Sequence, residues 1–160
     1  MQTEITWWDV IVRLMLSFAA GAVLGANRTE YGRVAGLRTT VLVCLTAAVS
    51  LVLANLLLQT TGKTPESFVS IDVMRLPLGI LTGMGFIGAG AILHKENIVV
   101  GVTTAATLWF TTIMGFCFGA GQLALGLGLL FLGVVVLWCL EWIESRLKQN
   151  LELWIFLTNR

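Results

Sequence analysis

The chain has 160 residues, of which 57% are hydrophobic and only 12% are charged. A soluble domain carries roughly 25% charged residues, because it must cover its core with a surface compatible with water. Ten basic and nine acidic residues leave a formal charge of +1, too little for the basic face of a nucleic-acid-binding protein. With a mean hydropathy of +0.89, the composition predicts an integral membrane protein of one domain rather than a multidomain enzyme.

Five apolar stretches are long enough to cross a hydrocarbon layer about 30 Å thick as helices. Helices are required because lipid offers no partners to unpaired backbone groups. The prediction is an all-α membrane bundle of about five transmembrane helices in residues 1–142, followed by a cytoplasmic tail in residues 143–160. The third stretch is rich in glycine, and its alternative is to re-enter the membrane rather than cross it. The stretches are Val10–Ala26, Thr39–Leu58, Leu76–Leu93, Ile98–Gly119 and Leu123–Leu140.

The basic residues are unevenly distributed between the two sides of this predicted bundle. Cytoplasmic loops of membrane proteins are enriched in Lys and Arg, so we expect the N-terminus outside and the C-terminus inside. Trp7 and Trp8 at one end, and Trp138 and Trp142 at the other, fit the aromatic belts of the two interfaces. This orientation places seven basic residues inside, namely Arg28, Arg33, Arg38, Lys95, Arg146, Lys148 and Arg160, against Arg13, Lys63 and Arg75 outside.

Glycine is the second unusual feature, with 17 residues in the chain. Three G-x-x-x-G pairs, Gly21–Gly25, Gly79–Gly83 and Gly115–Gly119, each give a helix one small face for close packing and for self-association into a homo-oligomer. The alternative for the third stretch is a discontinuous helix whose freed backbone lines a polar cavity. The expected helix-packing glycines of this stretch are Gly79, Gly83, Gly85, Gly88 and Gly90.

A few polar side chains lie within or beside the spans, where a charge is costly and usually faces a cavity or a partner. Asp72 and Arg75 are three residues apart at the mouth of the third span, so a helix places them on one face, either as an interfacial pair or as part of a site. Arg13 follows Asp9 by four residues and is expected to pair with it. Threonines of the fourth span can satisfy helix carbonyls internally, so they indicate a polar path only weakly. The candidate polar site comprises Asn27, Arg28, Arg38, Asp72, Arg75, Thr103 and Thr104.

The sequence holds no recognisable set of catalytic residues. It lacks a Ser-His-Asp arrangement, a Walker loop and a carboxylate dyad, so we expect neither an enzyme nor a bound cofactor. Cys44, Cys117 and Cys139 are far apart within apolar runs. This spacing is typical of buried cysteines that act as small hydrophobic residues, not of a disulfide framework or a zinc site.

Several motifs follow one another in a recognisable order. They are Arg13-Leu14, Gly25–Arg28, Gly36–Thr40, Asp72-x-x-Arg75, Gly83–Ile92, Gly101–Trp109 and Gly119–Gly121. This order resembles that of the MgtC/SapB family over roughly residues 13–140. Two positions depart from the family pattern: Asn27 stands where a glutamate is common, and Val102 stands where a leucine is common.

The resemblance implies a non-enzymatic protein of the bacterial inner membrane that supports Mg²⁺ homeostasis, growth in low Mg²⁺ and stress survival of the kind linked to virulence. It implies action on another membrane complex, with an F-type ATP synthase as one possible partner. The alternative is a small Mg²⁺ transporter or channel with a polar site around Asp72, Arg75 and the threonines, although a Mg²⁺ path needs oxygen ligands and retained waters. Many family members carry a soluble domain after the membrane part, so Leu151–Leu157 is expected to be its first strand or only a tail.

Overall fold

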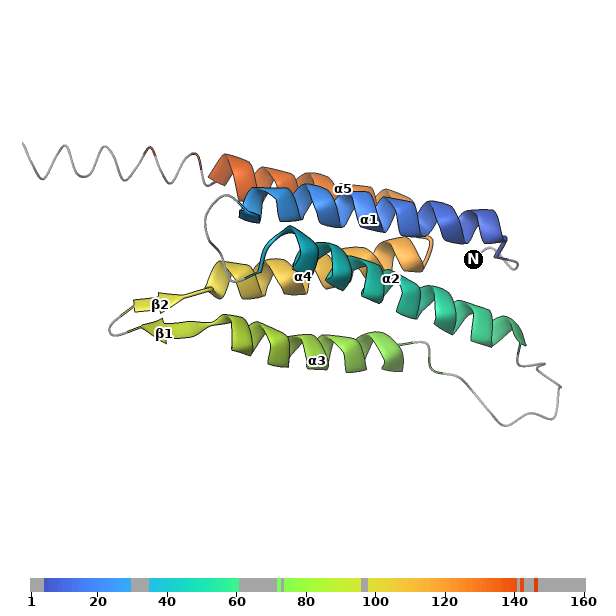
Figure 1. Ribbon diagram of the computed structural model, residues 1–160. Coiled ribbons are helices and arrows are strands. Elements are labelled where there is room, and N and C mark those ends of the chain that lie inside the picture. Colours follow the sequence, from blue (N-terminus) through green and yellow to red (C-terminus); the bar gives the residue numbers. More distant parts are fainter. Residues whose placement is uncertain are drawn as a thin grey trace, which may run out of the picture.

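The computed structural model describes residues 5–29, 35–60, 72, 74–95, 98–140, 142 and 146. In these residues five α-helices lie side by side and run alternately in opposite directions (Figure 1). They are α1 (Trp7–Thr29), α2 (Leu37–Thr60), α3 (Arg75–Ala91), α4 (Val102–Gly119) and α5 (Leu123–Val134). Helix α5 continues as a π-helical segment, η1 (Val135–Leu140). The predicted all-α bundle is therefore confirmed.

Four segments of the described chain are long and apolar enough to cross a membrane. Helix α3 has 17 residues, or about 26 Å at 1.5 Å per residue, one residue fewer than the segment Val102–Gly119 and at the lower limit for crossing a hydrocarbon layer of about 30 Å. It nevertheless runs antiparallel to α4 along most of its length (Figure 1). The third predicted span is thus the one without a counterpart among the four long segments of the described chain. The four long segments are Trp7–Arg28, Leu37–Leu57, Val102–Gly119 and Leu123–Leu140.

A β-hairpin separates α3 from α4. Strand β1 (Leu93–Lys95) pairs antiparallel with β2 (Ile98–Val100). The predicted third and fourth spans extended into these strands, so both boundaries are wrong. The physical reason is a β-branched run in β2 followed by Gly101, whose φ of 92° is left-handed and stops the strand before α4 begins. A Cβ on Gly101 would also clash with the carbonyl oxygen of Ala91.

The closest contacts in the bundle join α2 to α1 and to α4. A Cβ on Gly119 of α4 would clash with the Ala48 carbonyl oxygen of α2, and Gly115 meets α2 in the same way. On α1, Gly21 and Gly25 face α2, and a Cβ on either glycine would lie too close to backbone atoms of α2. Lipid tails are as apolar as leucine, so helices in a membrane associate through this kind of close backbone packing. Two of the three predicted G-x-x-x-G contacts are confirmed.

The glycines of α3 behave differently. Helix α3 packs on α4 through the face that carries Met84, Gly88 and Ala91, which are its buried residues. Only Gly88 has a neighbour at its Cβ position, the Ala105 Cβ at 3.5 Å. Among the described residues no helix covers the faces that carry the other four, so their helix-packing role stays a prediction for contacts with another chain. These four, with nothing within 4 Å of an ideal Cβ, are Gly79, Gly83, Gly85 and Gly90.

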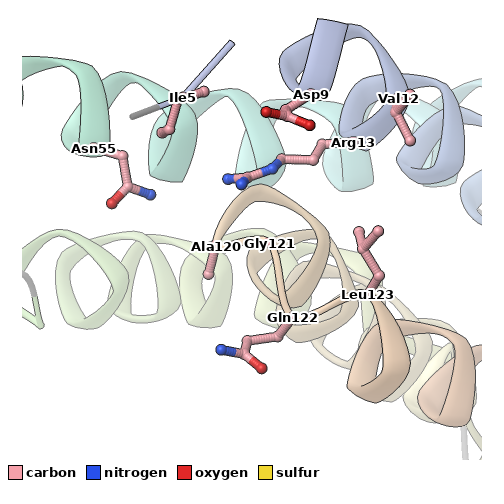
Figure 2. A pocket seen from close by; sticks show the side chains of 9 residues that line it. All are labelled: Ile5, Asp9, Val12, Arg13, Asn55, Ala120, Gly121, Gln122 and Leu123. Carbon is pink, nitrogen blue, oxygen red and sulfur yellow. The ribbon is translucent and has the colours of Figure 1, made fainter. Parts of the chain in front are cut away.

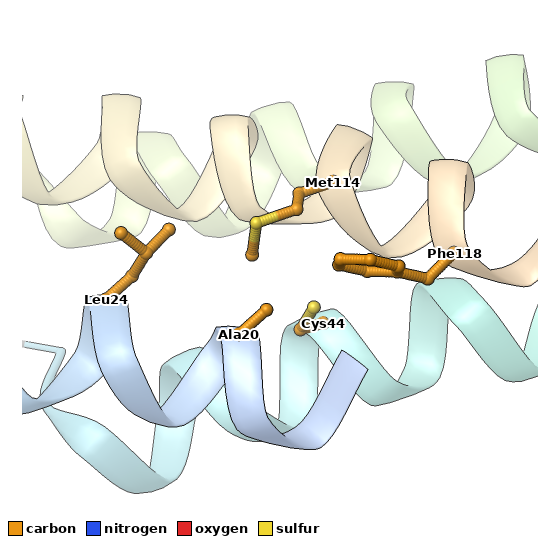
Figure 3. Packing of buried hydrophobic residues seen from close by; sticks show 5 residues of the cluster. All are labelled: Ala20, Leu24, Cys44, Met114 and Phe118. Carbon is orange, nitrogen blue, oxygen red and sulfur yellow. The ribbon is translucent and has the colours of Figure 1, made fainter. Parts of the chain in front are cut away.

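An apolar core lies between α1, α2 and α4 (Figure 3). Cys44 and Cys117 are buried, as the sequence predicts, whereas Cys139 is exposed on η1, so the prediction is wrong for that cysteine. The tail predicted for residues 143–160 lies outside the described residues except for Arg146, whose guanidinium lies 5.3 Å from the ring centre of Trp142. The core residues in Figure 3 are Ala20, Leu24, Cys44, Met114 and Phe118.

Candidate functional site

Helix α1 carries a buried arginine near each end. Only 7% of Arg13 and 1% of Arg28 is exposed. The two residues are about 22 Å apart along the helix, at 1.5 Å per residue. Since α1 and α4 are antiparallel, Arg28 contacts the first turns of α4 while Arg13 contacts its last residue. Buried charges are expensive in membrane proteins and usually serve function, so each arginine marks a candidate site.

The first candidate, called here the Arg28 cluster, consists of Arg28, Thr104 and Thr107. The Nη1 of Arg28 donates to Thr107 Oγ1 at 2.6 Å, and Nη2 donates to Thr104 Oγ1 at 2.7 Å. The Thr107 hydroxyl itself donates to the Thr103 carbonyl oxygen at 2.7 Å, so its lone pairs accept the arginine proton. All three side chains of the cluster are buried. The guanidinium is thus held in one orientation between α1 and α4.

The local sequence explains why these side chains meet. Thr104, Thr107 and Thr111 are spaced three and four residues apart, so they form one polar stripe on α4. Thr111 donates to the Thr107 carbonyl at 2.7 Å and Thr112 to the Leu108 carbonyl at 2.8 Å. This confirms that the threonines satisfy helix carbonyls internally. Their oxygens then remain available as acceptors, and the arginine uses two of them.

The structure brings together only part of the predicted polar site. Arg28 and Thr104 are in hydrogen-bond contact, and Asn27 is buried in the same turn of α1. Thr103 and Arg38 are exposed. Thr107, which the sequence analysis did not single out, could have been found from its spacing of three residues after Thr104.

Asp72 and Arg75 form an exposed pair at the start of α3. Arg75 Nε lies 3.5 Å from Asp72 Oδ2, and the two side chains are 85% and 54% exposed, respectively. Asp72 Oδ1 also accepts a hydrogen bond from the Met74 N–H at 3.0 Å, which forms a local turn just before α3 begins. The end of α3, not its start, lies beside the first turn of α4, where Gly88 meets Ala105. The pair therefore lies at the opposite end of the bundle from the Arg28 cluster, and the seven predicted residues do not form one site.

The second candidate is the Arg13 pocket, which the sequence analysis did not predict. Arg13 Nη1 donates to the Gly119 carbonyl oxygen at 3.0 Å, at the last residue of α4. No ion pair within 4.0 Å joins Arg13 and Asp9 among the described side chains, so their predicted pairing is wrong. Asp9 Oδ2 accepts instead from the Thr6 N–H at 3.2 Å. Both charged residues line a pocket of about 320 Å³ between α1, the end of α2 and the α4–α5 turn (Figure 2).

The chemistry of both candidates is hydrogen-bond donation from a buried guanidinium. Arginine presents its donors in a fixed planar fork and stays charged in proteins. In the ranges that the structure describes, no group of three or more His, Cys, Asp and Glu residues is placed to hold a metal ion. What the described interior offers is two fixed positive charges.

Comparison with known proteins gives one consistent result. The MgtC family model matches residues 14–146. The chain is 33% identical over 152 residues to "Putative magnesium transporter YhiD" of Escherichia coli, covering 94% of this chain and 70% of that protein. It is 38% identical over 130 residues to Protein SrpB of Synechococcus elongatus, covering 76% and 69%. It is 35% identical over 122 residues to Protein MgtC of Salmonella typhimurium, covering 76% of this chain and 48%, about half, of that protein. No solved structure matches the chain.

Proposed function

Because the chain belongs to the MgtC family, we propose that it supports Mg²⁺ homeostasis from the bacterial inner membrane by acting on another membrane complex. Growth in low Mg²⁺ and stress survival during infection are the traits this role would serve. A relative that is named as a magnesium transporter supports the link to Mg²⁺. An F-type ATP synthase is the partner that the family resemblance suggests.

The buried positive charge is the observation that carries a modulating role. A cation passing through the core of α1, α2 and α4 would meet Arg28 at one end and Arg13 at the other. Two unit charges 4 Å apart repel by about 4 kcal/mol at an effective dielectric constant of 20, so a buried guanidinium opposes a divalent ion that approaches it this closely. Between the arginines lie an apolar cluster and a few buried hydroxyls, which donate to carbonyls of their own helices, and the described interior there holds no acid. These features disfavour a Mg²⁺ path inside one chain.

Other features suit contact with a partner. The Asp72–Arg75 pair is exposed at one end of the bundle and offers both charges to a second protein. Most of the surface of α3 is exposed, including Phe86, which is 85% exposed between open glycine positions. A second copy of the chain or another membrane protein could therefore pack closely on α3.

Mg²⁺ transport between copies of the chain is the second candidate function. The name of the Escherichia coli relative favours it, and so does Asp72, an acid next to the open glycine face of α3. In this case the path would avoid both buried arginines, because it would run along α3 at an oligomer interface.

Growth and flux measurements separate these two functions. We expect the chain to restore growth in low Mg²⁺ to a strain that lacks its own family member. We also expect liposomes containing the purified chain to pass no more Mg²⁺ than empty liposomes. Asp72→Asn is the matched variant, since asparagine can still accept the Met74 N–H and keep the turn before α3. Reproducible Mg²⁺ flux that Asp72→Asn abolishes would overturn the modulating role in favour of transport.

The orientation of the bundle is a separate prediction. The first and last described helices run in the same direction (Figure 1), so the start of α1 and the end of η1 lie at opposite ends of the bundle. With seven basic residues against three, a reporter fused after Arg160 should be cytoplasmic and a tag at Lys63 should be reachable from outside. Both positions lie outside the described residues. A reporter after Arg160 that is accessible from outside would contradict the predicted orientation.

A further inference from the structure

The Arg13 pocket lies at the end of the bundle where aromatic side chains gather. Trp7 and Trp8 open α1 and are 75% and 70% exposed. Exposed tryptophans at the end of a membrane helix are typical of the headgroup level of the bilayer. A pocket of about 320 Å³ is at the lower end of the size range of small-molecule sites. Its position and size suit a small polar group at the membrane surface.

The guanidinium in this pocket is held in place before any ligand arrives. The side chain of Arg13 is more than nine-tenths buried, and its Nη1 is fixed by the Gly119 carbonyl. The α4–α5 turn is shaped around it, because Gly121 has a left-handed φ of 80° and a Cβ there would lie 2.7 Å from Arg13 Nη2. The Arg13 side chain has therefore already lost its conformational entropy on folding. Binding of a ligand does not have to order it, which favours binding.

The pocket also carries an opposite charge that does not neutralise the arginine directly. Asp9 and Arg13 both line it and lie next to each other above the α4–α5 turn (Figure 2), yet they form no ion pair within 4.0 Å among the described side chains. Two amides, from Asn55 and Gln122, complete the polar lining. Asn55 donates through Nδ2 to the Leu51 carbonyl at 3.0 Å, which leaves its Oδ1 as an acceptor. The lining therefore offers hydrogen-bond donors to an anion and acceptors to an ammonium group.

We propose that the Arg13 pocket binds a phosphoethanolamine group. The phosphate accepts hydrogen bonds from the Arg13 fork, a pairing whose planar geometry is favourable. The ammonium group donates to the Asp9 carboxylate and to Asn55 Oδ1. A headgroup of a phosphatidylethanolamine molecule in the adjacent leaflet is one source of this group, and a free phosphoethanolamine is the other.

The predicted specificity follows from hydrogen-bond chemistry. An ethanolamine ammonium has three N–H donors, whereas the quaternary ammonium of choline has none. Phosphatidylcholine can place its phosphate on Arg13 but donates no hydrogen bond to the carboxylate of Asp9, which then keeps only the one from the Thr6 N–H. The pocket should therefore discriminate between these two lipids, which have the same net charge.

Native mass spectrometry of the full chain in detergent tests the assignment. The protein is incubated with equal amounts of phosphatidylethanolamine and phosphatidylcholine that have identical acyl chains. We expect ethanolamine lipid to be retained roughly tenfold over choline lipid, the factor expected from one hydrogen bond to a charged group. Asp9→Asn should reduce this preference to about equal retention, and Arg13→Gln should lower the retention of both lipids.

Arg75→Gln is the charge-matched control, because Arg75 is exposed and outside the pocket; it should keep the full preference. If Arg13→Gln fails to fold, Asp9→Asn still decides, since asparagine can accept the Thr6 N–H as Asp9 does. Excess soluble phosphoethanolamine distinguishes the sources: displacement of the lipid supports a free group as ligand, and retention supports the lipid. Equal retention of the two lipids by the unmodified chain, or an undiminished preference in Asp9→Asn, would overturn the proposal.

Discussion

Gly119→Leu is expected to remove most of the folded protein from membranes, whereas Gly85→Leu should leave its amount and stability unchanged. At Gly119 even a single Cβ would clash with the Ala48 carbonyl oxygen and lie 2.9 Å from Leu51 Cβ, so α2 and α4 must move apart. Overpacking of a well-packed interior commonly costs about 1–3 kcal/mol, and here the obstacle is backbone that cannot rotate away. Nothing lies within 4 Å of a Cβ on Gly85, which makes it the matched control.

Size-exclusion chromatography and thermal melts in one detergent measure both variants. Gly83→Leu extends the series, because its Cβ position is also open within the chain. If copies pack through α3, as the homo-oligomer prediction holds, Gly83→Leu should keep the fold of each chain but shift the elution of the assembly. Gly88→Leu should disturb the contact with Ala105 on α4, because a Cβ at position 88 already lies 3.5 Å from the Ala105 Cβ. A normal melt and normal yield for Gly119→Leu would contradict the close contact of α4 with α2 at Gly119.

This contrast shows what glycine spacing can and cannot predict. The pairs Gly79–Gly83 and Gly115–Gly119 have the same spacing, so the sequence gives each helix one small face. Spacing does not say whether another helix covers that face. Helix α2 covers Gly115 and Gly119 of α4, whereas α3 turns one side to α4 and leaves Gly79 and Gly83 open.

The membrane-spanning segments could be predicted because the length of an apolar run is a property of the chain alone. The division between the third and fourth runs was visible at the polar residues His94–Asn97, but the ends of the two helices beside it were not. These ends depend on backbone conformation, since β1 pairs with β2 and Gly101 then turns left-handed before α4 begins. Hydropathy carries no information on that turn.

The burial of the two arginines could not be predicted either. An arginine near the end of a span usually extends its head group to the water, and an acid one turn away is its expected partner. For Arg13 the carbonyl at the end of α4 replaced Asp9 as the partner, and for Arg28 two hydroxyls of α4 were the partners. These partners are 76 to 106 residues away in sequence. Only the antiparallel packing of α1 on α4 brings them together.

Arg28→Met is expected to fold but to lose support of growth in low Mg²⁺. Methionine is flexible and can fill the space of the arginine stem, and removing the desolvation cost of the buried charge offsets the two hydrogen bonds that are lost. Thr107 would still donate to the Thr103 carbonyl, so no donor is left unpaired there. We expect the free energy of unfolding to change by no more than about 1 kcal/mol. Growth should fall to the level of the empty vector. The exposed Arg146 provides the control Arg146→Met, which should still support growth.

Removing the two hydroxyls instead of the arginine should lower the free energy of unfolding. Thr104→Val together with Thr107→Val keeps the shape of both side chains but removes two hydrogen bonds from a buried cation. Each hydrogen bond to a charged group contributes about 1.5–3 kcal/mol, so the double variant should lose about 3 kcal/mol or more. Adding Arg28→Met to it should restore most of that stability, because the charge that needed the hydroxyls is gone. Thermal melts of the four proteins measure this coupling.

Stability and growth together then separate structure from function at the Arg28 cluster. A purely structural arginine would make Arg28→Met unstable and would make growth follow the melting behaviour across the series. A functional arginine leaves the triple variant as stable as the unmodified chain yet unable to support growth. We expect the second pattern, because a guanidinium that is 1% exposed in a membrane bundle is held there at a cost in free energy that an apolar side chain would avoid. Growth restored by the triple variant at normal expression would remove Arg28 from the functional site.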